Sequence, residues 1–272
     1  MEPRLQRRVQ RYGWDRAVAH YEAAWQKQLE PAQRLLLDFA ALRQGERVLD
    51  IACGTGLVTF PAAAAVGPSG SIVGTDISEA MVEACRRTAA TRGLAHASFQ
   101  RMEAEALQFE DASFDVVLCA LGLMYVTDFP GSAREMCRVT RRGGRVAAAV
   151  WGRRDRCGWA EIFPIVDRRV QSEVCPMFFQ LGSGDLLADL MTAGGCARVR
   201  SQRLQTVLAY ESAADACLAA FAGGPVALAY SRFDAATRDA AHAEYLESIA
   251  PYRNGSGYEI PGEFVVTCGE ID

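Results

Sequence analysis

The sequence lacks the features that mark metal-binding, disulfide-stabilised or membrane-spanning proteins. Its nine cysteines are never closer together than 18 residues, so it contains no C-x-x-C pair and no zinc-ligand spacing. No apolar run approaches the roughly 18 residues of a membrane span. No basic segment followed by an apolar stretch resembles a secretory leader. We therefore expect a cytoplasmic protein with reduced, buried cysteines, no metal and no membrane partner.

An excess of positive charge is also missing. The 29 Lys and Arg residues are outnumbered by 33 Asp and Glu residues, which gives a net charge of −4. Without a broad basic surface we expect no nucleic-acid partner, and the short arginine clusters are expected to lie on solvated faces and turns. Half of the 272 residues are hydrophobic, enough for a core that folds without cross-links.

The first 45 residues have a helical pattern. Trp14, Val18, Tyr21, Trp25 and Leu29 follow one another at steps of three or four residues and form one stripe of a helix. A second helix is predicted from Pro31 to about Arg43.

From residue 47 onward, short apolar runs alternate with helical segments. This alternation predicts an α/β fold with a mostly parallel sheet of seven strands covered by helices on both faces. Ser78 is the expected N-cap of one helix and Gly93 its end. The predicted strands are 47–52, 71–77, 97–102, 114–121, 145–151, 197–210 and 262–270, and the predicted helices are 57–66, 78–93, 158–174, 184–195, 211–223 and 234–249.

A glycine loop, Gly54-Thr55-Gly56, follows the first predicted strand. Ligands of open parallel sheets bind beyond the carboxyl ends of the strands, and glycine lets the backbone approach them closely. The third glycine of a dinucleotide fingerprint is absent, because Leu57, Val58 and Thr59 follow Gly56. Asp50, just before the loop, would repel a pyrophosphate but suits a cationic amine.

Two further strands end in carboxylates. Asp76, 20 residues after Gly56, can accept hydrogen bonds from both hydroxyls of a ribose, although an Asp there can also cap a helix. Glu103 can accept from the amine of a base, beside the Ala104 N–H. An amine, a ribose, an adenine and an acid group together describe S-adenosylmethionine.

Four segments resemble the successive motifs of the class I S-adenosylmethionine-dependent methyltransferases. They are "VLDIACGTG", "VGTDIS", "MEAEALQFEDASFDVVLCALGLMYVTD" and "EMCRVTRRGGRVAAAVWG", within residues 45 to 152. They are most similar to the group that includes the ubiquinone/menaquinone-biosynthesis methyltransferases. The resemblance implies a Rossmann-like fold with an N-terminal helical lid (1–44), a cofactor-binding core (45–152) and a remainder with helical substrate-pocket insertions (153–272).

The resemblance also implies which residues bind the cofactor, S-adenosyl-L-methionine. The residues around the glycine loop should hold the methionine end of the cofactor, and Asp76 should hold its ribose. The residues after the third strand should contact the adenine, and those after the fourth strand should lie beside the sulfonium. The set is Asp50, Ala52, Cys53, Gly54, Gly56, Asp76, Ile77, Met81, Glu103, Ala104, Ala120 and Leu121. Two positions depart from the family: Glu103 replaces an Asp, and Trp151 stands where quinone C-methyltransferases carry an acid, which disfavours a quinone substrate.

The activity implied is transfer of a methyl group to a small molecule (EC 2.1.1.-), with an oxygen or carbon acceptor preferred to nitrogen or sulfur. His20 and Tyr125 are the candidate catalytic residues. The candidate acceptor pocket consists of Tyr21, Trp25, Met124, Tyr125, Trp151, Phe178 and Phe179, although each could equally be core. The sequence leaves open a homodimer, a binding protein that has kept only the fold, and, less favoured, a nicotinamide oxidoreductase.

Overall fold

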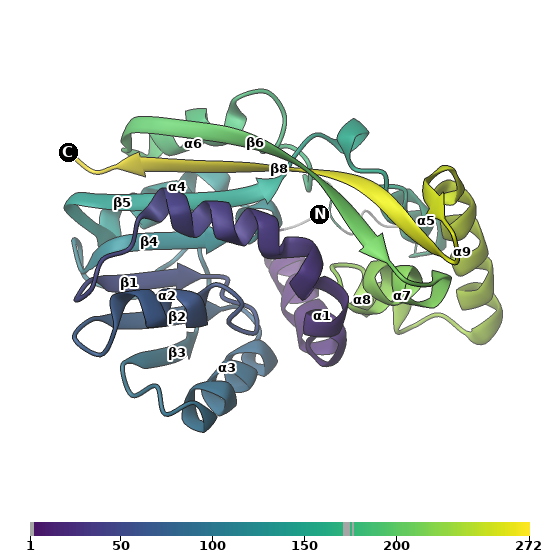
Figure 1. The fold of residues 1–272 in the computed structure, drawn as a ribbon, viewed down its shortest axis with the longest axis horizontal. Helices are drawn as coiled ribbons and strands as arrows, with labels where there is room; N and C mark the ends of the chain where they lie inside the picture. Colours follow the sequence, from purple (N-terminus) through teal and green to yellow (C-terminus); the bar gives the residue numbers. More distant parts are fainter. Residues whose placement is uncertain (1–2, 171–174, 176) are drawn as a thin grey trace.

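One twisted sheet organises the protein, whose structure is a computed structural model that describes residues 3–170, 175 and 177–272. The strand order is β3-β2-β1-β4-β5-β8-β6, and the short β7 pairs with β8 at one end (Figure 1). The first five strands are parallel, and β8 runs antiparallel between β5 and β6. The predicted mostly parallel α/β fold is confirmed. The strands are β1 (Arg47–Ile51), β2 (Ser71–Asp76), β3 (Ala97–Arg101), β4 (Phe114–Ala120), β5 (Thr140–Trp151), β6 (Ala197–Tyr210), β7 (Arg253–Asn254) and β8 (Gly257–Glu270).

Most helices begin and end within a few residues of the predicted limits. The side chain of Ser78 caps α3 as expected, accepting a hydrogen bond from the Met81 N–H. The residues predicted as one helix over 211–223 form α7 followed by a π-helical turn. Residues 171–174 of the predicted helix 158–174 lie outside the described residues. The helices are α1 (Pro3–Ala40), α2 (Thr59–Val66), α3 (Glu79–Thr91), α4 (Phe129–Val139), α5 (Ile162–Val170), α6 (Leu186–Gly194), α7 (Ala213–Cys217), α8 (Ala227–Tyr230) and α9 (Ala235–Ser248).

The expectation of two N-terminal helices was wrong, because α1 is one helix of 38 residues that contains Pro31. A proline inside a helix removes one backbone hydrogen bond and bends the axis, but it does not have to end the helix when both halves pack on the same body. Figure 1 shows the bend in α1. One part of the helix lies along the sheet, and the other turns toward the helices at its far end.

The helix α4 was absent from the sequence prediction. Its first turn contains Pro130 and Gly131, residues that are typical of turns. Proline is nevertheless well suited to the first turn of a helix, and Asp128 caps this one by accepting a hydrogen bond from the Gly131 N–H at 2.9 Å.

The strand order reverses between β1 and β4, and this is where ligands of open α/β sheets bind. The α1 helix packs against α3, β4, β5 and α8, so it crosses this point. Helices α5, α7, α8 and α9 gather beyond the end of the sheet to which β6 and β8 extend (Figure 1). Within the described residues, no helix is both long and apolar enough to cross a membrane.

Candidate cofactor and acceptor site

The glycine loop after β1 needs its glycines. Gly54 and Gly56 have φ of +55° and +94°, a region that residues with a Cβ rarely adopt. A Cβ on Gly56 would lie 2.4 Å from the ring of Phe60, and one on Gly54 would lie 3.5 Å from the ring of Tyr21. The loop is therefore packed against α2 on one side and covered by α1 on the other.

Asp76, at the end of β2, ties this loop to the next helix. One carboxylate oxygen accepts from the Gly54 N–H at 2.9 Å and the other from the Ser78 N–H at 2.8 Å. Burial raises the pKa of Asp76 to about 6 against the lowering effect of these hydrogen bonds. Each oxygen keeps a second lone pair, so the predicted bonds to a ribose are compatible with this geometry.

Asp50 lies in β1, before the glycine loop, and its side chain is buried, with 1% of the residue exposed. One oxygen accepts from the Thr59 hydroxyl at 2.5 Å, while the other has no hydrogen-bond partner among the described residues. Burial raises the pKa of Asp50 to about 7. Its charge acts on the site, because it helps to raise the pKa of Tyr21. Direct contact with a ligand amine stays a prediction.

A hollow with about 760 Å³ of empty space, part of which is open solvent, lies at the carboxyl ends of β1, β2 and β4 and is here called the strand-end cavity. Three of the predicted cofactor residues do not line it: Cys53 and Asp50 are buried behind it, and Gly56 faces Phe60. The structure brings the other nine together there, namely Ala52, Gly54, Asp76, Ile77, Met81, Glu103, Ala104, Ala120 and Leu121.

Two lining residues carry backbone strain. Ala52 and Leu121 have φ of +55° and +62° although neither is glycine. Each follows a central strand, β1 and β4 respectively, and each lines the strand-end cavity. Such conformations persist where the surrounding structure imposes them, and they concentrate at ligand sites.

The N-terminal turns of α1 are fastened across the strand-end cavity. The Arg7 guanidinium donates to Glu105 at 3.0 Å and to the Thr127 hydroxyl at 3.2 Å. Glu105 also accepts from the Thr127 and Asp128 N–H groups, at 2.7 and 2.8 Å. One carboxylate thus joins α1 to the segment after β4, and these hydrogen bonds keep the pKa of Glu105 below its usual value despite its burial.

Replacing Arg7 with alanine is expected to weaken cofactor binding about fivefold, since a charged hydrogen bond at a partly exposed site contributes about 1 kcal/mol. The matched control is Arg8→Ala, because Arg8 is the exposed neighbour of Arg7. Calorimetric titration with S-adenosylmethionine checks the difference. Equal affinities for the two variants would mean that the Arg7–Glu105 contact does not hold α1 over the cofactor.

A second, smaller hollow adjoins the first and has about 340 Å³ of empty space, part of which is open solvent. We call it the tryptophan cavity, because all four tryptophans of the chain line it. Trp14, Tyr21, Leu121 and Tyr125 border both cavities. The remaining residues that line the tryptophan cavity are Trp25, Leu29, Trp151, Trp159, Phe178, Gly224 and Pro225.

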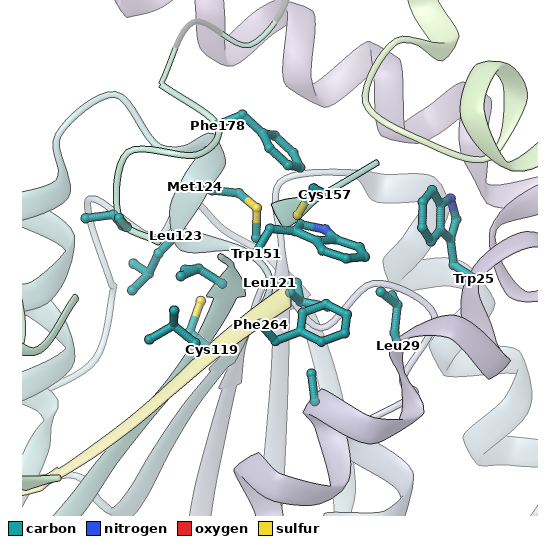
Figure 2. Close-up of a cluster of buried hydrophobic side chains, with 14 of the residues drawn as sticks. Trp25, Leu29, Cys119, Leu121, Leu123, Met124, Trp151, Cys157, Phe178 and Phe264 are labelled. Atoms are coloured by element: carbon teal, nitrogen blue, oxygen red, sulfur yellow. The ribbon is translucent and has the colours of Figure 1, made fainter. Parts of the chain in front are cut away.

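The tryptophan cavity contains five of the seven predicted acceptor-pocket residues. Tyr21, Trp25, Tyr125, Trp151 and Phe178 line it, whereas Met124 is buried and does not line it, and Phe179 packs on Phe178 with ring centres 4.8 Å apart. Figure 2 shows Trp151 with Trp25 of α1 to one side and Phe264 of β8 below it. The ring centres of Trp151 lie 6.0 Å from Trp25 and 4.2 Å from Phe264.

The two predicted catalytic residues differ in position. His20 is exposed and lines neither cavity, so the geometry gives no support to its predicted role. Tyr125 lies at the border of the cavities, with its ring 5.2 Å from Trp14 and 5.5 Å from Phe178. Burial raises the pKa of both Tyr125 and Tyr21, so their hydroxyls stay neutral at physiological pH.

Sequence reasoning missed several lining residues, among them Arg7, Gln10 and Trp159. The first two could have been found, because the stripe that begins at Trp14 continues toward the N-terminus at the same helical spacing. Trp159 precedes α5 in a segment without periodicity, so only its residue type was a signal.

These residues fit S-adenosylmethionine. The Asp76 carboxylate and the glycine loop offer the groups that a ribose and a carboxylate tail require, and the buried Asp50 oxygen without a partner can act on an amine by its charge from behind the cavity. With this sheet order, the site defines a class I S-adenosylmethionine-dependent methyltransferase domain. The family model described as "Methyltransferase domain" matches residues 42–157, and these residues belong to that class.

Among known proteins, the chain is similar to the nocamycin O-methyltransferase of Saccharothrix syringae. The two are 39% identical over 133 residues, 49% of this chain and 48% of the relative. It is also 41% identical over 115 residues to a ubiquinone/menaquinone biosynthesis C-methyltransferase of Ectopseudomonas mendocina, covering 42% of this chain and 45% of that enzyme. The chain thus spans about half the length of these relatives.

The fold extends further than the sequence similarity. The crystal structure of YcgJ from Bacillus subtilis superposes with a TM-score of 0.61 at 19% identity, over 89% of this chain and 98% of that protein. At this identity the likeness concerns the fold alone.

Proposed function

We propose that this protein transfers a methyl group from S-adenosylmethionine to an oxygen of a small conjugated acid, such as a carboxylic acid or the acidic enol of a 1,3-dicarbonyl compound. The observation that carries the proposal is the pair of adjoining cavities, one with carboxylates and a glycine loop and the other lined by aromatic rings. In keeping with the sequence reading, residues 1–44 would act as the lid, 45–152 as the cofactor-binding core and 153–272 as the substrate-pocket part. We place the reaction in the cytoplasm.

The preference for an acidic oxygen follows from the absence of a base. Among the described residues that line the tryptophan cavity there is no His, Asp, Glu, Lys or Arg. An alcohol, a phenol or an ammonium group would need a base to remove its proton, whereas a carboxylic acid or the acidic enol of a 1,3-dicarbonyl compound loses its proton to water before it binds. The similarity to an O-methyltransferase favours oxygen as well. The aromatic Trp151, in place of an acid, argues against a quinone C-methylation.

The chain's own contribution is positioning. Bound S-adenosylmethionine supplies an electrophilic methyl group on a sulfonium. Tyr21, Leu121 and Tyr125 form the border across which the acceptor must face that methyl, with the reacting atoms roughly 3–3.5 Å apart. The neutral hydroxyls of Tyr21 and Tyr125 can orient the acceptor oxygen by hydrogen bonds. Aromatic faces tolerate the nearby cation, and the apolar lining excludes water.

The test is a transfer assay with methyl-labelled donor and a panel of conjugated acids, alcohols and amines of similar size, analysed by mass spectrometry. We expect labelled methyl esters or ethers of the acids and no product from the alcohols or amines. If only the amines of the panel were labelled, the acceptor atom would be nitrogen and the proposed oxygen acceptor would be wrong. Calorimetry with no detectable heat at millimolar S-adenosylmethionine would exclude the cofactor and with it the reaction.

A further inference from the structure

All four tryptophans of the chain surround one cavity, although they are spread over about 145 residues of sequence. Trp14 and Trp25 come from α1, Trp151 from the end of β5, and Trp159 from the segment before α5. The rings of Trp25, Trp151 and Trp159 meet edge to face, with centres 4.8 Å apart for Trp151 and Trp159 and 5.9 Å apart for Trp25 and Trp159. Such walls suit a flat ring system, which gains contact with several aromatic faces at once.

The Trp159 side chain has an unused hydrogen-bond donor. The residue is 3% exposed, and its indole nitrogen is buried without a hydrogen-bond partner among the described residues. Buried donors are rarely left unpaired in folded proteins, and tryptophan N–H groups usually find an acceptor. Trp159 lines the tryptophan cavity and does not line the strand-end cavity, so it lies away from the border where transfer would occur.

The surroundings of Trp159 are aromatic. Its ring packs near Trp25, Trp151, Phe163 and Phe178, none of which carries an oxygen. No charged side chain lines the cavity among the described residues. An oxygen on a ligand could therefore pair with this N–H, while a full charge at this end of the ligand would find no counterion.

We propose that the tryptophan cavity binds a flat conjugated ring system that is uncharged at its far end and presents a carbonyl-type oxygen there to the Trp159 indole N–H. Trp159 then determines specificity by hydrogen-bonding part of the ligand that does not react. This inference rests on the proposed function only in taking that ligand to be the methyl acceptor. A site built to hydrogen-bond an oxygen discriminates against analogues without it, because the donor is then left buried and unpaired.

The experiment compares two small probes of nearly equal shape, acetophenone and α-methylstyrene, in which a methylene replaces the carbonyl oxygen. Proton–nitrogen correlation spectra of the ¹⁵N-labelled protein resolve the indole N–H signals of its four tryptophans. We expect both probes to shift signals from the cavity, and acetophenone alone to move the Trp159 signal strongly downfield. This readout needs no substitution and no methyl donor.

Two variants separate hydrogen bonding from ring contact. Trp159→Phe keeps an aromatic ring but removes the N–H, and is expected to weaken acetophenone binding about tenfold while leaving α-methylstyrene within twofold. Trp25→Phe, in the same cavity, should affect both probes equally. Retained binding of α-methylstyrene also shows that the Trp159→Phe variant is folded.

Three results would overturn the inference: no response of the cavity signals to either probe, an equal response of the Trp159 signal to both, or equal weakening of both probes by Trp159→Phe. The proposed function fails differently. If the probes bind but the labelled-donor assay shows no methyl transfer, the proposed function is wrong and the proposed binding site stands. If a panel acid is methylated but does not move the Trp159 signal, the proposed function stands and the binding site is wrong.

Discussion

Replacing Asp76 with alanine is expected to weaken S-adenosylmethionine binding at least a hundredfold and to lower the melting temperature. The carboxylate accepts the Gly54 and Ser78 N–H groups, both of which lose their partner in the variant. Each hydrogen bond to a buried charge contributes about 1.5–3 kcal/mol, and about 1.4 kcal/mol corresponds to tenfold in affinity. The glycine loop would lose its link to α3, and the ribose its predicted acceptor.

Calorimetric titration and thermal unfolding measure the two effects of this substitution. The control is Glu79→Ala, since Glu79 is an exposed carboxylate at the start of the same helix, paired with Arg86 and Arg101. It should bind the cofactor as the unchanged protein does. If Asp76→Ala kept full affinity, Asp76 would have no part in cofactor binding, and the site would have to be sought elsewhere.

Replacing Asp50 with asparagine is expected to have opposite effects on stability and on binding. Burial raises the pKa of Asp50 to about 7, well above the value of about 3.9 in an unfolded chain. Between these values the folded state binds more protons, so the stability from Asp50 is fully present below about pH 4 and is lost as the pH rises through about 7. Asp76 adds a change of the same sign up to about pH 6.

At pH 8 the ligand-free Asp50→Asn variant should therefore be the more stable protein, by about 2 kcal/mol, because the charge penalty of at most about 4 kcal/mol is partly replaced by the cost of a buried amide. The advantage should vanish toward pH 4. The affinity for S-adenosylmethionine should change in the opposite direction. In the unchanged protein the affinity rises between pH 6 and pH 7, as Asp50 and Asp76 ionise. At pH 8 the affinity of the Asp50→Asn variant should be about tenfold lower than that of the unchanged protein.

Urea unfolding at pH 4.5 and pH 8 measures the pH dependence of stability. Calorimetric titrations with S-adenosylmethionine across the same pH range measure the pH dependence of affinity. Thr59→Val is a useful companion, because it removes the one hydroxyl that donates to Asp50 without removing the charge. A variant that is less stable at pH 8, or that binds the cofactor with unchanged pH dependence, would show that Asp50 is not a buried charge acting on the ligand.

Much of the fold could be predicted because its signals are local. The apolar strands, the Ser78 cap and the end of α3 just before Gly93 agree with the structure to within about five residues. The failures were also local. A second helix was predicted to start at Pro31, yet tertiary packing keeps this proline inside α1. No helix was predicted over α4, which begins at the Asp128 cap with Pro130 in its first turn.

The candidate site was predicted where it depends on strand ends and not where it depends on packing. Asp76 and the predicted residues after β3 and β4 line one cavity, because parallel strands end at the same edge of the sheet. The sequence did not show that Asp50 lies behind that cavity, where its carboxylate accepts a hydrogen bond from the Thr59 hydroxyl. The roles of Trp159 and Arg7 depend on contacts between distant segments, which periodicity does not report.

The α1 helix forms a wall common to two chambers, because Trp14 and Tyr21, two turns apart on one face, border both cavities. If this segment swings outward, it uncovers donor and acceptor together. Under the proposed function, spent donor and methylated product would then leave in a single gating event, and the rate of helix opening would set an upper limit on turnover.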